Sequence, residues 1–192
     1  MTDTIDDPRQ KAILASAFQA FAAYGYRKTS MDDIARGAGM SRPAVYLHYK
    51  NKEAIVRKLT EVYYSEKSAA VAEALATSGT VPEVLTRAVQ AQTAGMATIL
   101  ASPHGLEMLD NTKSMAADII AEGEAKLAGL YADWLTQQAQ AGRVKMPADA
   151  AETGWTITAT LKGLKLAGAG AETYEKQVAQ IASLIGAGLE VR

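Results

Sequence analysis

The sequence predicts an all-α protein, with a three-helix head at residues 8–50 and a larger helical body at residues 51–192. Alanine-rich stretches place their apolar residues with the 3.6-residue period of a helix. β-Branched and aromatic residues are scattered rather than alternating as they do in strands. No Asn-Gly or Asp-Gly dipeptide offers the tight turn of a β-hairpin.

Capping residues mark three helices in the head. Ser, Asp and Asn side chains accept hydrogen bonds from the first free N–H groups of a helix, and glycine commonly follows its last turn. Ser30-Met-Asp-Asp resembles a capping box with Asp in place of the usual Glu. In chain order, the helices are expected from Asp7 to Gly25, from Ser30 to Gly37, and from a cap at Ser41.

Six further helices are expected in the body, about nine in all. Asn51 caps a long helix that runs to Ser78-Gly79. Thr80-Val-Pro-Glu is a second capping box, which opens a helix to about Ser102, and Pro103 marks the break. The remaining helices are expected at His104–Asp110, at Ser114–Ala141, from Pro147 and Asp149 to about Gly168, and at Glu172–Val191.

Charge divides the chain into a basic head and an acidic body. Residues 8–58 hold ten Lys or Arg and three Asp or Glu, a net of +7 against a total of −1, which leaves −8 for the rest. This split indicates that a polyanion contacts one end of the protein, although a solvated surface with locally uneven charge gives the same count.

The composition excludes several kinds of site. The chain has no cysteine, and therefore no disulfide, thiolate metal site or catalytic thiol, which fits a reducing cytoplasm. Its two histidines, His48 and His104, form no metal-ligand spacing and no Ser/His/Asp set, and no Gly-rich phosphate loop follows a strand. We expect no metal, no cofactor and no enzymatic activity.

The N-terminal sequence and the apolar runs bear on where the protein works. MTDTIDDPRQ is acidic and polar where a secretory signal needs cations and an apolar stretch. No segment reaches the roughly 18 apolar residues of a membrane span. We therefore expect a cytoplasmic protein that makes no membrane contact.

The second and third helices form a helix-turn-helix pattern, in which the second helix of the pair enters the major groove of DNA. The third helix is too short to be stable alone, so burial must stabilise it. We expect its inner stripe, Val45 and Tyr49, to pack on Ile34, Phe18 and Phe21.

The outer stripe of the third helix is then free for DNA. Arg42 presents a planar fork that fits guanine O6 and N7, a contact worth roughly 1 to 3 kcal/mol of base discrimination. Tyr46 and His48 suit phosphates better. Lys52 and the first amides of the next helix form an anion site whose partner would be a backbone phosphate.

These residues also carry a resemblance. FAAYGYRKTSMDDIARGAGMSRPAVYLHYKNKEAI, residues 21–55, resembles the DNA-binding domain of the tetracycline-repressor (TetR) family. The shared features are a Gly after the first helix, Thr-Ser before the second, and the order IA..AG.S...VY.HY..KE. The resemblance implies phosphate contacts at Thr29, Ser41, Tyr46, His48 and Lys52, and base-reading positions at Arg42, Pro43, Ala44 and Leu47.

Two positions depart from the family pattern. Tyr49 stands where the family often has Phe, and we expect a core residue whose hydroxyl reaches the edge of the core. Pro43 and Leu47 are apolar at reading positions, so direct readout is expected to rest on Arg42 and on apolar contacts to thymine methyl groups.

For the body, the resemblance implies a homodimer through the last two helices. Two half-sites about one helical turn apart, roughly 34 to 36 Å, match a palindrome. The terminal helices carry more apolar residues than one hairpin should expose, although a pair buried within one chain would explain them too. The expected interface residues are Leu161, Leu164, Val178, Ile181, Leu184 and Ile185.

The resemblance also implies a ligand cavity in the body. The candidate lining residues are Tyr63, Tyr64, Met96, His104, Met108, Met115, Tyr131, Trp134 and Trp155, a set equally typical of an ordinary core. Few of them are charged, which favours an apolar or aromatic small molecule with His104, Glu107 or a tyrosine hydroxyl as its polar partner.

The function implied is a repressor that binds a palindromic operator in double-stranded DNA and is released when the small molecule displaces the helix beginning at Asn51 and Lys52. Activation of transcription, and repression without an inducer, remain alternatives. A ligand-binding helical protein without a DNA function would lack the basic head.

Overall fold

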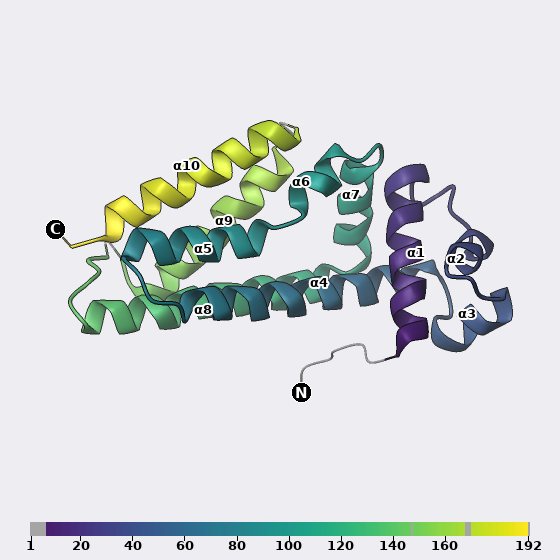
Figure 1. The fold of residues 1–192 in the computed structure, drawn as a ribbon, viewed down its shortest axis with the longest axis horizontal. Helices are drawn as coiled ribbons and strands as arrows, with labels where there is room; N and C mark the ends of the chain where they lie inside the picture. Colours follow the sequence, from purple (N-terminus) through teal and green to yellow (C-terminus); the bar gives the residue numbers. More distant parts are fainter. Residues whose placement is uncertain (1–6, 147, 168–169, 192) are drawn as a thin grey trace. The chain divides into compact units, whose positions relative to one another are not determined.

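The computed structural model describes residues 7–146, 148–167 and 170–191. Within these ranges it has ten helices and no strand, so the predicted all-α fold class is confirmed (Figure 1). No helix in the described ranges combines the length and apolar character needed to cross a bilayer. The helices are α1 Pro8–Tyr24, α2 Met31–Gly37, α3 Arg42–His48, α4 Lys52–Leu75, α5 Val81–Thr93, α6 Met96–Ala101, α7 Gly105–Met115, α8 Ala117–Gln140, α9 Ala150–Leu166 and α10 Ala171–Leu189.

The predicted caps are present as hydrogen bonds. In the box that opens α2, the Ser30 N–H donates to Asp33 Oδ2 at 2.9 Å and the Asp33 N–H donates to Ser30 Oγ at 3.1 Å, so the shorter acid replaces Glu. The box at Thr80 and Glu83 opens α5 in the same way. Side-chain caps at Asp7, Ser41, Asn51 and Asp149 begin four other helices.

One helix break was missed by the sequence prediction. The helix expected from Thr80 to Ser102 is divided into α5 and α6, because Ala94 is non-helical and Gly95 has φ +80°. This left-handed conformation suits glycine and cannot continue a right-handed helix. The count is therefore ten helices rather than about nine.

Other boundaries differ by smaller amounts. The helix expected to end at Asp110 continues to Met115, and Ala116, with φ −138° and ψ 34°, separates it from α8. Pro147 and Gly168, the expected limits of the next helix, lie outside the described residues. The Asp149 side chain caps α9 by accepting from the Glu152 N–H at 2.7 Å.

Contacts divide the chain into two compact units. The first comprises the residues up to Ser65 together with Ile99–Ala121, and the second comprises Glu66–Thr98 and the residues from Glu122 onward. In the first unit α1 packs on α2 and α2 packs on α3 (Figure 1). Its core consists of Ile13, Leu14, Ala17, Phe21, Met31, Ile34, Ala35, Val45, Tyr49, Ile55 and Val56.

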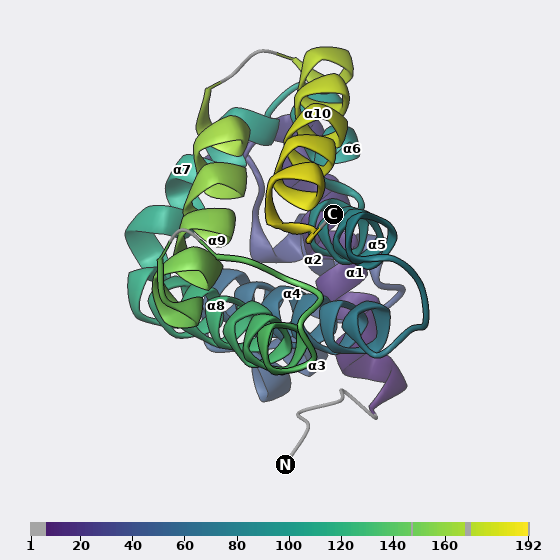
Figure 2. The same cartoon turned by 90° about the vertical axis from the view of Figure 1, so that its left-hand side faces the viewer.

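The second unit is built on close helix packing. Figure 2 shows α10 alongside α5, where Gly186 lies so near Pro82 that a Cβ would stand 2.7 Å from the Pro82 Cα. α9 packs on α8 at Gly154, whose Cβ would stand 2.5 Å from the Ala128 carbonyl oxygen. Tyr131 of α8 is fully buried, and its hydroxyl donates to Gln92 Oε1 of α5 at 2.9 Å.

In the first unit, Arg57 joins α4 to the boundary between α7 and α8. Its Nη1 donates to the Met115 carbonyl oxygen at 2.9 Å, and its two terminal nitrogens donate to the two Asp118 oxygens at 2.8 and 2.7 Å. Both Asp118 oxygens are bound by one planar fork, an arrangement that holds the geometry strongly. The hydrogen bond from Arg57 lowers the pKa of the Asp118 carboxyl from 3.8 to about 2.

Substituting Gly154→Ala should destabilise the protein, because the new methyl group would overlap α8 backbone atoms that cannot move independently. We expect a loss of about 1 to 3 kcal/mol in the free energy of unfolding, measured by urea titration. Gly129→Ala on α8 is the matched control, since its Cβ would meet nothing within 4 Å. That change should stabilise by roughly 0.5 to 1 kcal/mol. Equal effects of the two changes would contradict this packing.

The Arg57–Asp118 pair predicts a pH dependence. The folded pKa of Asp118 is lowered, so the pair's contribution is complete above about pH 4 and is lost as pH falls toward 2. The difference in urea midpoint between wild type and Asp118→Asn should therefore shrink across this interval. In an Arg57→Ala background, the difference in urea midpoint caused by Asp118→Asn should not change across this pH interval. A constant difference from pH 6 to 2 would exclude the pair as its source.

Candidate nucleic-acid interface

The inner face of α3 is buried as predicted. Val45 has no exposed surface and Tyr49 is 7% exposed, and both belong to the core that contains Phe21 and Ile34. Phe18, expected in the same core, is half-buried and lies outside it. Burial of one face thus replaces the length that an isolated helix would need.

α2 is fixed closely against α1. Ser16 of α1 is buried, and its hydroxyl donates to the Ile34 carbonyl oxygen at 2.8 Å. A Cβ at Gly37 would overlap the Ser16 hydroxyl, so this position tolerates only glycine without a shift of Ser16. Gly39, with φ +67°, then makes the turn toward α3.

The outer face of α3 is open to solvent. Arg42 and Pro43 are exposed, Tyr46 is 41% exposed and Leu47 is 86% exposed. Ala44, another predicted reading residue, is half-buried. The Ser41 hydroxyl accepts from the Ala44 N–H at 3.3 Å and so caps the helix. The structure therefore exposes three of the four predicted base-reading residues, Arg42, Pro43 and Leu47.

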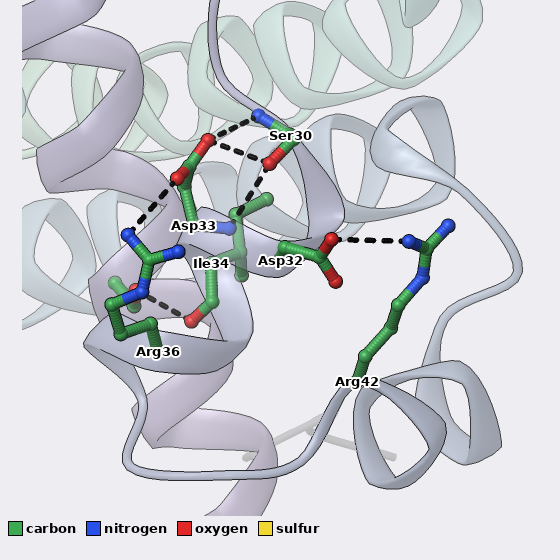
Figure 3. Close-up of polar contacts among 7 residues, drawn as sticks. Ser30, Asp32, Asp33, Ile34, Arg36 and Arg42 are labelled. Carbon is green, nitrogen blue, oxygen red and sulfur yellow. Dashed lines mark hydrogen bonds and ion pairs between the residues drawn. The ribbon is translucent and has the colours of Figure 1, made fainter.

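Arg42 has two partners on the surface of the head. Its Nη1 lies 3.1 Å from Asp32 Oδ2 on α2 (Figure 3), and its Nη2 donates to the Tyr46 hydroxyl at 3.4 Å. The guanidinium carbon lies 5.5 Å from the Tyr46 ring centroid. Exposed ion pairs contribute little stability, so these contacts chiefly orient the fork. Sequence reasoning missed Asp32, because nothing in a helical period links it to Arg42.

The other three predicted phosphate contacts, like Ser41 and Tyr46, have partners within the chain. Thr29 is 3% exposed, and its hydroxyl donates to the Gly25 carbonyl oxygen at 2.8 Å. His48 Nδ1 lies 3.7 Å from Asp7 Oδ2. Lys52 Nζ donates to the carbonyl oxygens of Tyr26 and Thr29 at 2.6 and 2.7 Å. Tyr26 is a further residue of the head that sequence reasoning did not single out.

The predicted ligand residues are divided between the two units. Tyr63, Tyr64, His104, Met108 and Met115 belong to the first, and Met96, Tyr131, Trp134 and Trp155 belong to the second. Burial also separates them: Tyr131, Trp134 and Met96 are at most 7% exposed, whereas Trp155 is 52% exposed on α9.

The first unit contains a cleft of about 600 Å³ beside one of these candidates, His104. His104 Nδ1 lies 2.8 Å from Glu107 Oε2, and both residues face Gly25 at the end of α1. Each lining residue bears a polar or charged group, while most of the surface that the lining presents is apolar. Its residues are Tyr24, Arg27, Lys28, His104, Glu107, Asp110 and Asn111.

The residues predicted to form the dimer interface differ in how deeply they are buried within the single chain. Leu161 and Val178 are buried within the second unit, while Leu164, Ile181 and Ile185 are half-buried. Leu184 on α10 is 60% exposed. Trp155 and Leu166 on α9 are further exposed apolar side chains.

Tyr49 lies in the core, as the sequence predicts, and lines a surface hollow together with Lys58 and Glu61; the notable feature is its hydroxyl. It is buried without a hydrogen-bond partner among the described residues. Burial raises the pKa of this phenol, since its charged form would be desolvated. The ring fills the core below α3, and the oxygen contributes nothing that the structure shows.

Substituting Tyr49→Phe should therefore leave the fold intact and raise the free energy of unfolding by about 1 kcal/mol, because a buried unpaired hydroxyl is costly. Chemical denaturation measures the change. Tyr131→Phe is the control, since that hydroxyl is paired with Gln92 and its removal should destabilise. If Tyr49→Phe destabilised as much as Tyr131→Phe, the Tyr49 hydroxyl would have a partner after all.

Comparisons with known proteins agree with this geometry. The sequence model described as "Bacterial regulatory proteins, tetR family" matches residues 13–59, which include α2 and α3. The HTH-type transcriptional repressor Rv1474c of Mycobacterium tuberculosis is 33% identical over 152 residues, 73% of each chain. The HTH-type transcriptional regulator EthR of Mycolicibacterium smegmatis is 40% identical over 55 residues, 29% of this chain and 25% of that one.

A solved structure extends the likeness to nearly the whole chain. The transcriptional regulator from Cytophaga hutchinsonii matches with a TM-score of 0.77 and 18% identity, over 96% of this chain and 100% of that one. At this identity the likeness concerns the fold. Rv1474c shares most of its length with this chain, and these relatives are regulators of transcription rather than enzymes. The chain belongs to the TetR family of DNA-binding transcriptional regulators.

Proposed function

We propose that this regulator is a repressor that binds a palindromic operator as a homodimer and leaves it when a small molecule occupies the body. The proposal depends on one observation: α3 is buried on one face, while Arg42, Tyr46 and Leu47 on its other face are exposed to solvent in a basic head. The likeness to Rv1474c, a transcriptional repressor, favours repression over activation. Residues 8–50 are the proposed DNA-binding domain, and residues 51–192 are the proposed ligand-binding and dimerisation domain.

The proposed DNA contacts divide into reading and positioning. Arg42 reads guanine through its fork, and Pro43, Ala44 and Leu47 contact thymine methyl groups. Ser41, Tyr46 and His48 contact phosphates, which set the register without reading sequence. Operator DNA lies in the cytoplasm of a bacterial cell, and this is the proposed location of the protein.

Apolar side chains on the last two helices support a homodimer. Trp155 and Leu166 on α9 and Leu184 on α10 are each about half exposed or more in the single chain. Large apolar side chains exposed on neighbouring helices are typical of an interface. A two-fold dimer presents two α3 helices to half-sites one helical turn apart, roughly 34 to 36 Å.

The proposed effector is an apolar or aromatic small molecule, and α4 is the proposed transmitter. α4 begins at Lys52, directly after the α3 turn, and continues into the second unit. A ligand that displaces α4 changes the separation of the two reading helices. A coupling of about 1 to 3 kcal/mol would weaken operator binding some 5- to 150-fold.

The test is selection of duplexes from a random-sequence pool by the purified protein, followed by titration of the selected duplex beside a scrambled one. Preference for a palindrome by roughly 10³-fold or more would support a specific dimeric regulator. The protein should first be refolded from denaturant, so that a co-purified ligand cannot mask binding. Selection of no common sequence by the refolded protein would refute the proposal.

Arg42→Ala should reduce affinity by roughly 1 to 3 kcal/mol for the selected operator, with the loss concentrated at one base pair of each half-site. Titration against single-base variants of the operator measures this pattern. Arg36→Ala is the matched control, because Arg36 is an exposed cation on α2 rather than on the reading face. Its effect should be uniform across the variants. A uniform loss with Arg42→Ala would contradict base reading by Arg42.

A further inference from the structure

Arg42 carries a positive charge at a position where the helix itself does not favour one. It is the first residue of α3, and the free amide groups at a helix N-terminus make cations unfavourable there. The first turn of α3 contains no acidic residue to offset this charge. The acidic partner comes from another helix: Asp32 of α2, whose Oδ2 lies 3.1 Å from Arg42 Nη1.

Two adjacent acidic residues in the first turn of α2 have different partners. Asp33 accepts hydrogen bonds from the N–H and the hydroxyl of Ser30, and its Oδ1 lies 3.5 Å from Arg36 Nη1 (Figure 3). The Asp32 side chain points toward Arg42 instead, and about half of its surface is exposed (Figure 3). Asp33 therefore caps α2, while Asp32 is directed to the reading helix.

The contacts of Arg42 in the free head leave it able to bind a base. A guanidinium has five N–H donors. Asp32 and the Tyr46 hydroxyl accept one each, from different terminal nitrogens, which leaves three. Guanine O6 and N7 need two. The fork can therefore keep both partners while it contacts guanine.

Pairing with Asp32 changes how Arg42 responds to DNA. An unpaired arginine is attracted to any phosphate, whatever the sequence. Asp32 and Arg42 together carry no net charge, so the pair attracts a distant phosphate only weakly. A phosphate that contacts the fork must also approach the Asp32 carboxylate, which repels it. An uncharged guanine meets no such repulsion, so the pair favours a base over the backbone.

We propose that Asp32 is a specificity-determining residue of the DNA interface, because it holds the Arg42 fork and neutralises its charge, so that Arg42 binds guanine and gains little from the phosphates of non-matching DNA. Asp32 is a positioning residue, since it acts through Arg42. The inference rests on the proposed reading of guanine by Arg42.

The experiment uses the full chain and Asp32→Asn, which removes the charge and keeps the shape of the side chain. The salt dependence of binding to a scrambled duplex counts phosphate contacts, because each contributes about 0.9 to the slope of log K against log salt concentration. Titration of single-base variants of the selected operator measures discrimination at the base pair that Arg42 reads. Both measurements are repeated in an Arg42→Ala background.

Glu53→Gln is the matched control. Glu53 is an exposed acidic residue in the first turn of α4, so its replacement removes the same charge from the head and from the same part of a helix. Any effect of net charge or of the helix dipole alone should therefore appear in both variants. Discrimination at the base pair that Arg42 reads should change only in Asp32→Asn.

Asp32→Asn should steepen the salt slope on the scrambled duplex by about 0.9, since Arg42 becomes free to contact a phosphate. Discrimination at the base pair that Arg42 reads should fall by about threefold or more. Neither change should occur in the Arg42→Ala background. In DNA-free protein, NMR relaxation of Arg42 Nε should show a more mobile guanidinium in Asp32→Asn than in the wild type.

Three results would overturn the inference alone: unchanged discrimination in Asp32→Asn, an equal loss of discrimination with and without Arg42, or an unchanged mobility of the guanidinium. The second of these would mean that Asp32 contacts a base itself. A uniform loss of affinity across the operator variants in Arg42→Ala would be a different failure, because it would remove the proposed reading of guanine together with the inference that rests on it.

Discussion

A reading helix of seven residues must leave one face free for DNA, and it therefore depends entirely on the burial of its other face. α3 has too few internal hydrogen bonds to be stable alone. Val45 and Tyr49 attach it to a core formed by α1, α2 and α4. The glycine at position 37, which lets α2 approach Ser16, serves the same requirement, because the core beneath α3 must not move. On the proposed interface, the position of the DNA-facing side chains is therefore set by apolar packing on the opposite side of the helix.

Helix starts were predictable because their causes are local. The boxes at Ser30 and Thr80 require only residues three positions apart, and both form as the sequence indicates. The break at Ala94 was missed and the boundary at Ala116 was predicted a few residues too early, since alanine favours helix and no proline stands beside either position. Gly95 was the available signal for the first break. Whether such a glycine ends a helix or lies inside a continuous one depends on how the neighbouring helices pack.

In the candidate site, too, some features were predictable from the sequence and others were not. Helical periodicity correctly assigned Val45 to the core and Arg42 and Tyr46 to the outer face, because the face of a residue depends on its spacing. Partners of polar side chains depend on how the helices are arranged. Lys52 and Tyr26, or Arg57 and Asp118, lie far apart along the chain, and no pattern in the sequence connects them. Family resemblance identified important positions in the head without indicating which groups those side chains contact in the free protein.

Leu47 is 86% exposed in the free head, and on the proposed interface this has a thermodynamic consequence. Placing a leucine against a thymine methyl group removes apolar surface from water, which gives a negative heat-capacity change of binding. That contribution is insensitive to salt, whereas phosphate contacts weaken steeply as salt rises. The share of binding free energy that distinguishes one sequence from another should therefore grow as ionic strength increases. An exposed leucine would make the protein most selective under the conditions in which it binds DNA least tightly.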